Sequence, residues 1–131
     1  MSRDYRKLRV FEAADNAVEA VYKASRRFPI DERFGLQAQL RRAAVSTACN
    51  IVEGSARRTT RDYLHFLTIA SASAEESRYL VGLAHRLGFM PRQEHDSLIT
   101  QYSAVVAGLQ ALIRSLSADD AGNAEASSTG A

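Results

Sequence analysis

The segment LITQYSAVVAGLQALIRSL (residues 98–116) predicts a long amphipathic helix, because its apolar residues recur with the period of an α-helix. One row follows the heptad spacing of four and three and consists of Leu98, Tyr102, Val105, Leu109, Leu112 and Leu116. A second row beside it consists of Ile99, Val106 and Ile113. The two rows together are wider than a single coiled-coil seam, so this helix either lies deep in a bundle or contacts another subunit.

Two helical segments with clear end signals occupy the first half of the chain. The first, over about residues 5–27, follows the N-cap residue Asp4 and stops before Pro29, because the residue before a proline leaves the α region. The second, over about residues 32–54, follows Asp31 and ends near Gly54. The buried row expected of the first is Leu8, Phe11, Asp15, Val18, Tyr22 and Ser25. The buried row expected of the second is Leu36, Leu40, Ala44, Ala48 and Ile51.

A third helical segment, over about residues 60–87, begins after Thr59, which with Asp62 forms an acidic variant of the capping box, and ends at Gly88. Its buried row is Tyr63, Leu67, Ala70, Ala74, Leu80, Ala84 and Leu87. The small side chains of residues 70–74 predict a close crossing with another helix. The fourth segment, over about residues 91–117, has Pro91 in its first turn.

These segments predict an all-α fold, an up-down-up-down antiparallel four-helix bundle, because short connections make consecutive helices antiparallel. A length of 131 residues suits one domain, and 7 Gly and 2 Pro favour helices over a many-turned β fold. We assign the bundle to residues 1–117. Residues 118–131 contain no large apolar side chain to offset the entropy of ordering, so we expect this tail to be disordered.

Composition also excludes several locations and classes. The single Cys49 cannot form an intrachain disulfide, which fits a reducing compartment. The longest unbroken apolar run is residues 104–107, far too short to cross a membrane. The basic start of the sequence lacks the apolar segment of a secretory signal. We therefore expect a cytoplasmic protein without membrane contact.

The residues that commonly carry catalysis or bind metals are sparse. His65, His85 and His95 do not stand four residues apart, and Asp62-x-x-His65 is only a distant relative of the motif of di-iron bundles. Cys49 has no basic neighbour at helical spacing and is expected to be inert packing. We therefore expect no metal, no cofactor, no catalytic residue and no small-molecule substrate, and so no enzyme.

The charge of the chain is unevenly distributed. It carries 17 Lys and Arg against 15 Asp and Glu, but three of the acids follow residue 117, so residues 1–117 have a net charge of +5. A basic cluster consists of Arg41, Arg42, Arg57, Arg58 and Arg61. Only Glu53 and Asp62 oppose it, so it predicts contact with phosphates or acidic protein, the alternative being a solvated face of two helices. Tyr63 and Phe66 beside it either stack with guanidinium groups, as in single-strand binders, or belong to the core, which is the place expected of Phe66.

A polar row also follows helical spacing along the second segment. It consists of Gln39, Arg42, Ser46, Asn50, Glu53 and Arg57. A solvent-facing surface explains the row in one interpretation. In the other it is a partly buried hydrogen-bond network, in which Arg42 or Arg57 pairs with Glu53 and Asn50 fixes the register between helices or subunits.

The most specific motif is Arg-Arg-Ala-x-x-Ser, starting at Arg41, followed by Asn-Ile-x-Glu-Gly, starting at Asn50. With it occur Phe28-Pro29, Glu32, Leu36, Gln39, Tyr63, Phe66-Leu67 and Ile69-Ala70. Over about residues 8–115 the chain resembles the bacterial four-helix bundle proteins encoded in intervening sequences of 23S ribosomal RNA genes. The chain departs from the family at Phe11, where Trp is common, at Thr47-Ala48, which replaces Ile-Pro, and at Ala72, which replaces Gly.

The resemblance implies a homo-oligomer, a pentameric ring around a central channel, without established enzymatic activity. The fold also resembles the accessory subunit of diversity-generating retroelements, whose basic pentameric barrel engages reverse transcriptase and nucleic acid. The family motif falls on Arg41, Arg42, Ser46, Asn50, Glu53, Gly54 and Arg57, without a proven role for any of them. The expected function is binding of RNA or a nucleoprotein through a basic surface. The alternative is a protein scaffold whose arginines form intersubunit salt bridges.

Overall fold

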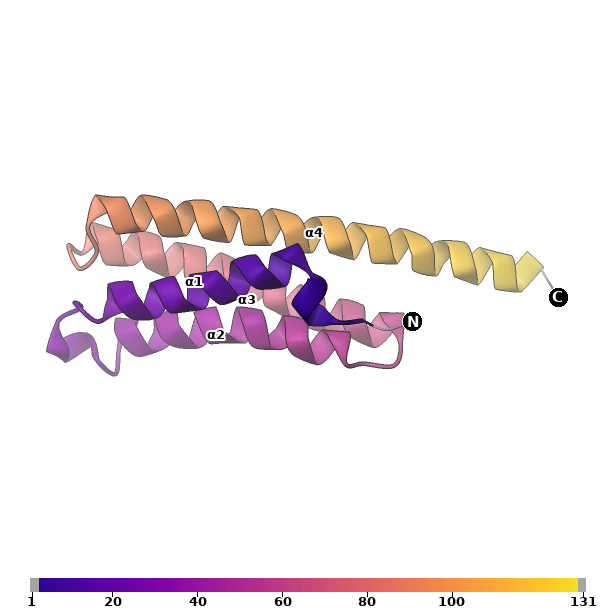
Figure 1. Cartoon of the computed structure of the whole chain (residues 1–131), viewed down its shortest axis with the longest axis horizontal. Helices are drawn as coiled ribbons and strands as arrows, with labels where there is room; N and C mark the ends of the chain where they lie inside the picture. Colours follow the sequence, from indigo (N-terminus) through magenta and orange to yellow (C-terminus); the bar gives the residue numbers. More distant parts are fainter. Residues whose placement is uncertain (1–2, 130–131) are drawn as a thin grey trace.

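The computed structural model describes residues 3–129, with side chains as far as Gly122, and this part of the chain forms four α-helices and no strand. They are α1 (Arg9–Ser25), α2 (Leu36–Ser55), α3 (Thr60–Arg86) and α4 (Arg92–Thr129), with the short 3-10 helices η1 (Tyr5–Lys7) and η2 (Ile30–Glu32). Consecutive helices run antiparallel (Figure 1), and α1 and α3 each pack on both α2 and α4. The predicted all-α bundle is confirmed, and its assembly into a ring stays a prediction.

The small residues of α3 lie where α2 and α3 meet. The hydroxyl oxygens of Ser46 and Ser73 are 2.8 Å apart, and Ala70 and Ala74 are fully buried. At the end of α2, a Cβ added to Gly54 would lie only 2.9 Å from Phe66 Cβ. The predicted close crossing is therefore present, and it depends on residues without large side chains at the contact.

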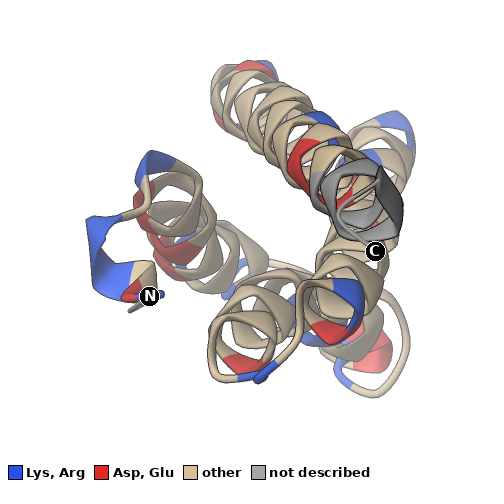
Figure 2. Ribbon diagram, turned by 90° about the vertical axis from the view of Figure 1, so that its right-hand side faces the viewer, with Lys and Arg blue, Asp and Glu red and all other residues tan. Residues whose placement is uncertain are grey.

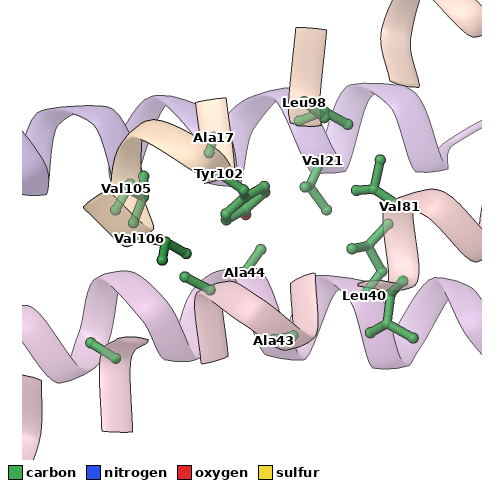
Figure 3. Packing of buried hydrophobic residues seen from close by; sticks show 14 of the residues in the cluster. Ala17, Val21, Leu40, Ala43, Ala44, Val81, Leu98, Tyr102, Val105 and Val106 are labelled. Carbon is green, nitrogen blue, oxygen red and sulfur yellow. The ribbon is translucent and has the colours of Figure 1, made fainter. Parts of the chain in front are cut away.

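The core runs the length of the bundle and is rich in alanine. The heptad row of α4 supplies four of its larger members: Leu98, Tyr102, Val105 and Leu109 are buried, as predicted, whereas Leu112 and Leu116 of the same row are half-buried. Figure 3 shows Tyr102 at the centre, among Ala17 of α1, Ala44 of α2 and Val106 of α4. A bundle built with this many alanines brings its helix backbones close together around a few large side chains.

Tyr102 gives the core a measurable pH dependence. Its ring is fully buried, and its hydroxyl has no hydrogen-bond partner among the side chains that the structure describes. Burial raises the pKa of Tyr102 to about 12, and the nearby Ser77 hydroxyl lowers it to a smaller extent. An unfolded tyrosine, with its pKa near 10, loses its proton first as the pH rises. Folding stability therefore falls from about pH 10 to about pH 12, by roughly 2 to 3 kcal/mol in total.

Urea unfolding between pH 8 and 11 follows the first part of this loss, and Tyr102→Phe is the matched variant. The phenylalanine protein is expected to lose less stability over the alkaline range and to be at least as stable at pH 7, because no unpaired hydroxyl is buried. An identical alkaline loss in both proteins contradicts the assignment to Tyr102.

The buried row of α1 differs from the predicted one. The buried residues are Ala14, Ala17, Val21, Ala24 and Ser25. Of the predicted row, Asp15 is exposed, Tyr22 is 39% exposed, and Leu8, Phe11 and Val18 are half-buried. The predicted row was chosen for its large side chains, but α1 packs against its neighbours mainly through alanines. Leu87, predicted to be buried at the end of α3, is 52% exposed.

The ends of α3 are as predicted. Thr59 Oγ1 accepts the backbone N–H of Asp62 at 3.1 Å. Gly88 has a φ of 81°, its N–H donates to the His85 carbonyl, and the Phe89 N–H donates to the Ala84 carbonyl. These two bonds form a Schellman motif, which needs the left-handed conformation that glycine adopts without strain.

The starts of α1 and α2 differ from the predicted ones. Asp4 caps η1 by accepting the Arg6 N–H at 3.0 Å, and α1 itself begins at Arg9. The expected start near residue 32 is displaced because residues 30–32 form η2, and α2 begins at Leu36. Glu32 Oε2 reaches forward to accept the Leu36 N–H at 2.9 Å, so its long side chain does the capping expected of Asp31.

The segment after residue 117 also differs from its prediction as disordered, because α4 continues to Thr129. An existing helix grows without the cost of nucleation, and the segment contains several alanines and no proline. Residues 130 and 131 lie outside the described residues. The end of α4 extends past the end of the bundle at which the N-terminus lies (Figure 1).

Candidate nucleic-acid interface

One end of the bundle combines two basic segments that are far apart in the sequence. Arg57, Arg58 and Arg61 are exposed in the connection between α2 and α3 and the first turn of α3. Arg3 crosses to them: its Nη1 donates to the Arg57 carbonyl at 2.8 Å and to the Thr59 carbonyl at 3.4 Å. Figure 2 views this end, with basic ribbon on both the N-terminal segment and the α2–α3 connection. We call it the basic end.

Acidic residues at the basic end are fewer than the cations. Asp4 pairs with Arg6 at 2.9 Å, and that guanidinium holds the pKa of the Asp4 carboxyl below its usual range. Lys7 is exposed and borders, with Arg3 and Tyr63, a hollow of about 300 Å³. Once the Asp4–Arg6 pair is set aside, the cations of this end include Arg3, Lys7, Arg57, Arg58 and Arg61. The exposed acids in the adjacent helix ends are Glu12, in the first turn of α1, and Glu53 and Asp62.

The two aromatic residues beside the arginines have different environments. Tyr63 is 3% exposed and belongs to the core, where burial raises the pKa of its hydroxyl and the nearby Arg3 charge lowers it to a smaller extent. Arg3 covers its ring at 4.8 Å from the ring centre. Phe66 is half-buried, and Arg57 lies 4.5 Å from its ring centre. Both rings thus lie against a guanidinium group, but Tyr63 is the one buried in the core, which differs from the core position expected of Phe66.

The predicted five-arginine cluster is divided in the structure. Arg41 and Arg57 are separated by most of α2, roughly 20 Å at the rise of an α-helix. Arg41 turns toward α1, where its Nε donates to Ser25 Oγ at 2.8 Å and its Nη2 to the Tyr22 carbonyl at 3.3 Å. Arg42 is exposed and, among the residues whose side chains are described, forms no hydrogen bond or ion pair.

Neighbouring Arg41 and Arg42 therefore make a matched pair of variants. Arg41→Ala is expected to lower the free energy of unfolding by about 1–2 kcal/mol, because it removes two charged hydrogen bonds and a guanidinium that lies over the Tyr22 ring. Arg42→Ala is expected to change it by less than about 0.5 kcal/mol. Urea unfolding of both variants makes the comparison, and equal losses contradict the different roles assigned to the two side chains.

The predicted polar network exists only in the middle of α2. Asn50 Nδ2 donates to the Ser46 carbonyl at 2.8 Å and to Ser46 Oγ at 3.1 Å, and Ser46 Oγ bonds to Ser73 Oγ of α3. Asn50 therefore supports the α2–α3 register through Ser46. Gln39 and Arg42 border a hollow of about 190 Å³ with Ser46 and Glu76.

Glu53 is not part of the network. It is exposed, and among the described side chains it pairs with neither Arg42 nor Arg57. The expected ion pair is therefore absent from a single copy of residues 3–122. Helical spacing predicted that Arg42, Glu53 and Arg57 share one row. In the structure, the guanidinium of Arg57 lies over the ring of Phe66 and not beside Glu53.

The three histidines and the cysteine differ in their surroundings. His85 of α3 and His95 of α4 stack with ring centres 4.6 Å apart, a contact that the sequence did not indicate, and His65 is exposed. Among the described residues, no group of three or more His, Cys, Asp or Glu could hold a metal ion. Cys49 is exposed, which differs from the expected packing role. The same part of the chain contains no helix with the length and apolarity to span a membrane.

The prediction from the sequence did not include the N-terminal segment in the basic surface. The basic residues Arg3 and Lys7 were its only signal, and their approach to the α2–α3 connection depends on the direction in which the chain leaves α1. The prediction also did not include Phe34 and Ile30, whose side chains are 87% and 83% exposed. The available signal in the sequence was the presence of two large apolar residues in the connection between two helices.

Comparison with known proteins assigns the chain to a family. A family model described as 23S rRNA-intervening sequence protein matches residues 6–111. The fold is similar to the crystal structure of a protein of unknown function from the S23 ribosomal protein family of Bacteroides thetaiotaomicron VPI-5482, with 23% identity and a TM-score of 0.72 over 80% of this chain and 95% of the other. No curated protein matches the sequence. The chain therefore belongs to the 23S rRNA-intervening sequence protein family.

Proposed function

We propose that this protein is a cytoplasmic, non-catalytic homo-oligomer that binds RNA, alone or in a nucleoprotein such as a reverse transcriptase complex, through the basic end. The proposal rests on the cations that come together at the basic end. Arg57, Arg58 and Arg61 are exposed beside Arg3 and Lys7, which the fold brings from a different part of the chain. Such a convergence of cations attracts phosphates, whose bound counterions are released on binding.

Self-association strengthens this attraction. Ile99, Leu112, Ile113 and Leu116 are only partly buried in a single copy, so α4 retains apolar surface for a neighbour. Residues 1–117 carry +5 per copy, and a pentameric ring, the assembly that the family resemblance implies, would gather about +25 from them. The affinity for RNA then comes from the phosphate contacts of all copies in the ring together, so each copy needs to contribute only a few.

A scaffold function without RNA is the second candidate, and Arg41 favours it. This arginine forms hydrogen bonds within the bundle, to Ser25 and Tyr22. Arg3 likewise donates hydrogen bonds to the α2–α3 connection. If the remaining arginines are used in the same way between subunits, a stable oligomer has no affinity for nucleic acid.

The two candidates differ in a titration of structured RNA with the full-length protein across a salt series, with molar mass followed by light scattering. The proposal predicts that one oligomeric species binds and that log affinity falls linearly with log salt concentration. A stable oligomer that binds no RNA at physiological salt contradicts RNA binding and supports the scaffold. A monomer that binds RNA contradicts the assembly part of the proposal.

A further inference from the structure

A second surface combines aromatic rings with arginines, away from the basic end. A groove of about 490 Å³ lies against α1, the start of α2 and the connection between them, and its lining includes Tyr22, Arg33, Phe34, Arg41 and Arg42. No acidic residue is among its lining residues in the described part of the chain. We call it the α1–α2 groove.

The rings of this groove are open to solvent. Phe34 is 87% exposed, and Arg33 lies 5.4 Å from its ring centre. Tyr22 is 39% exposed, and Arg41 lies 4.5 Å from its ring centre. Because the Phe34 side chain is almost wholly accessible, its ring has surface free for a planar ligand even with the guanidinium nearby.

We propose that the α1–α2 groove binds an unpaired nucleotide of RNA, whose base stacks on Phe34 and whose phosphate meets Arg33 and Arg42. The inference rests on the proposed RNA binding and adds a site for single-stranded RNA to it. Arg33 and Arg42 are both exposed, and neither forms an ion pair among the described side chains. Stacking of bases on aromatic rings beside guanidinium groups is the usual means by which proteins hold unpaired nucleotides.

The lining favours a nucleotide over an apolar helix of another protein. The walls contain three guanidinium groups, and the apolar residues between them, Ala38 and Val45, are small. A flat base with an attached phosphate matches an open aromatic ring bordered by unpaired cations. An acidic peptide matches the cations but gains nothing specific from the ring, which makes it the appropriate competitor in the test.

The test uses Phe34→Trp, since the chain contains no tryptophan and the variant has one fluorophore in the groove. Stacking of an oligo(A) RNA on the indole is expected to quench its emission at the RNA concentrations at which fluorescence anisotropy of the labelled RNA shows binding. A blunt duplex RNA, whose bases are paired, is expected to bind without quenching. The matched control is Tyr79→Trp, because Tyr79 is 61% exposed and lies 5.9 Å from Arg86 outside the groove, and its emission is expected to stay constant.

Affinity gives a second measurement. Phe34→Ala is expected to weaken binding of oligo(A) about tenfold and to leave duplex RNA unaffected. Its thermal unfolding midpoint is expected to match the wild type, because the side chain is almost fully exposed. Equal affinity of Phe34→Ala and wild type for oligo(A) overturns the site.

Three further outcomes overturn the inference and leave the proposed function intact. The first is RNA binding, shown by anisotropy, without quenching of the Phe34→Trp emission. The second is equal quenching by a glutamate-rich peptide, which assigns the groove to a protein partner. The third is a change of emission with protein concentration alone, which assigns it to contacts between copies. Absence of any RNA binding in the anisotropy measurement overturns both the site and the proposed function.

Discussion

Replacing Arg57, Arg58 and Arg61 together by Glu is expected to weaken RNA binding about a thousandfold. Two unit charges 4 Å apart in water interact by about 1 kcal/mol, so each reversal changes a phosphate contact by up to about 2 kcal/mol before salt screening. The negative slope of log affinity against log salt concentration is expected to become less steep by about 2 to 3 for each copy that contacts the RNA, because that copy loses three phosphate contacts. Titration of labelled RNA at several salt concentrations measures both quantities.

The control for the triple variant reverses three exposed arginines at the opposite end of the bundle. Arg26, Arg86 and Arg92 lie at the end of α1 and around the turn from α3 to α4, and changing them to Glu alters the net charge by the same amount. A much smaller loss of affinity is expected from this variant. Equal losses in the two variants would show that net charge, rather than the basic end, determines RNA binding.

Replacing Gly54 by Val is expected to destabilise the protein by about 3 kcal/mol, because α2 and α3 approach closely at this residue. Even a Cβ would lie 2.9 Å from Phe66 Cβ and 3.0 Å from Tyr63 Cδ1. Phe66 Cβ is bonded directly to the backbone of α3, so the two helices have to separate to make room. The thermal midpoint is expected to fall by roughly 10 °C.

Gly82 provides the matched control. It also lies within a helix, α3, but a Cβ added there would meet nothing within 4 Å. Gly82→Val is expected to leave stability unchanged or to raise it slightly, because glycine is a poorer helix former than valine. Scanning calorimetry compares the two variants, and a Gly54→Val protein as stable as Gly82→Val contradicts the close approach.

The fold was predictable because its signals are local. The heptad row of α4, the threonine cap of α3 and the glycine that ends it each depend on residues within a few positions of one another. The register of α1 was not predictable from the same kind of pattern. Ala14 and Ala17 are buried because other helices come close to them, and nothing in α1 itself distinguishes them from exposed alanines.

The candidate site was predictable only in its residue types. Arg41 and Arg42 are adjacent, and successive residues point in directions about 100° apart around a helix. One therefore faces Ser25 and Tyr22 of α1, and the other faces solvent. The partners of Arg41 and Arg3 come from distant parts of the chain, so the division of the arginines between structure and surface follows from the tertiary fold alone.

Amide hydrogen exchange, measured with and without structured RNA, locates the bound RNA on the chain and so shows whether RNA binds at the basic end. When RNA is bound, exchange is expected to slow in the N-terminal residues 3–8 and in residues 56–61, which form the α2–α3 connection and the start of α3. Little change is expected at the opposite turn, residues 87–91, between α3 and α4. Bound RNA with unchanged exchange at residues 3–8 and 56–61 would contradict the assignment of RNA binding to the basic end.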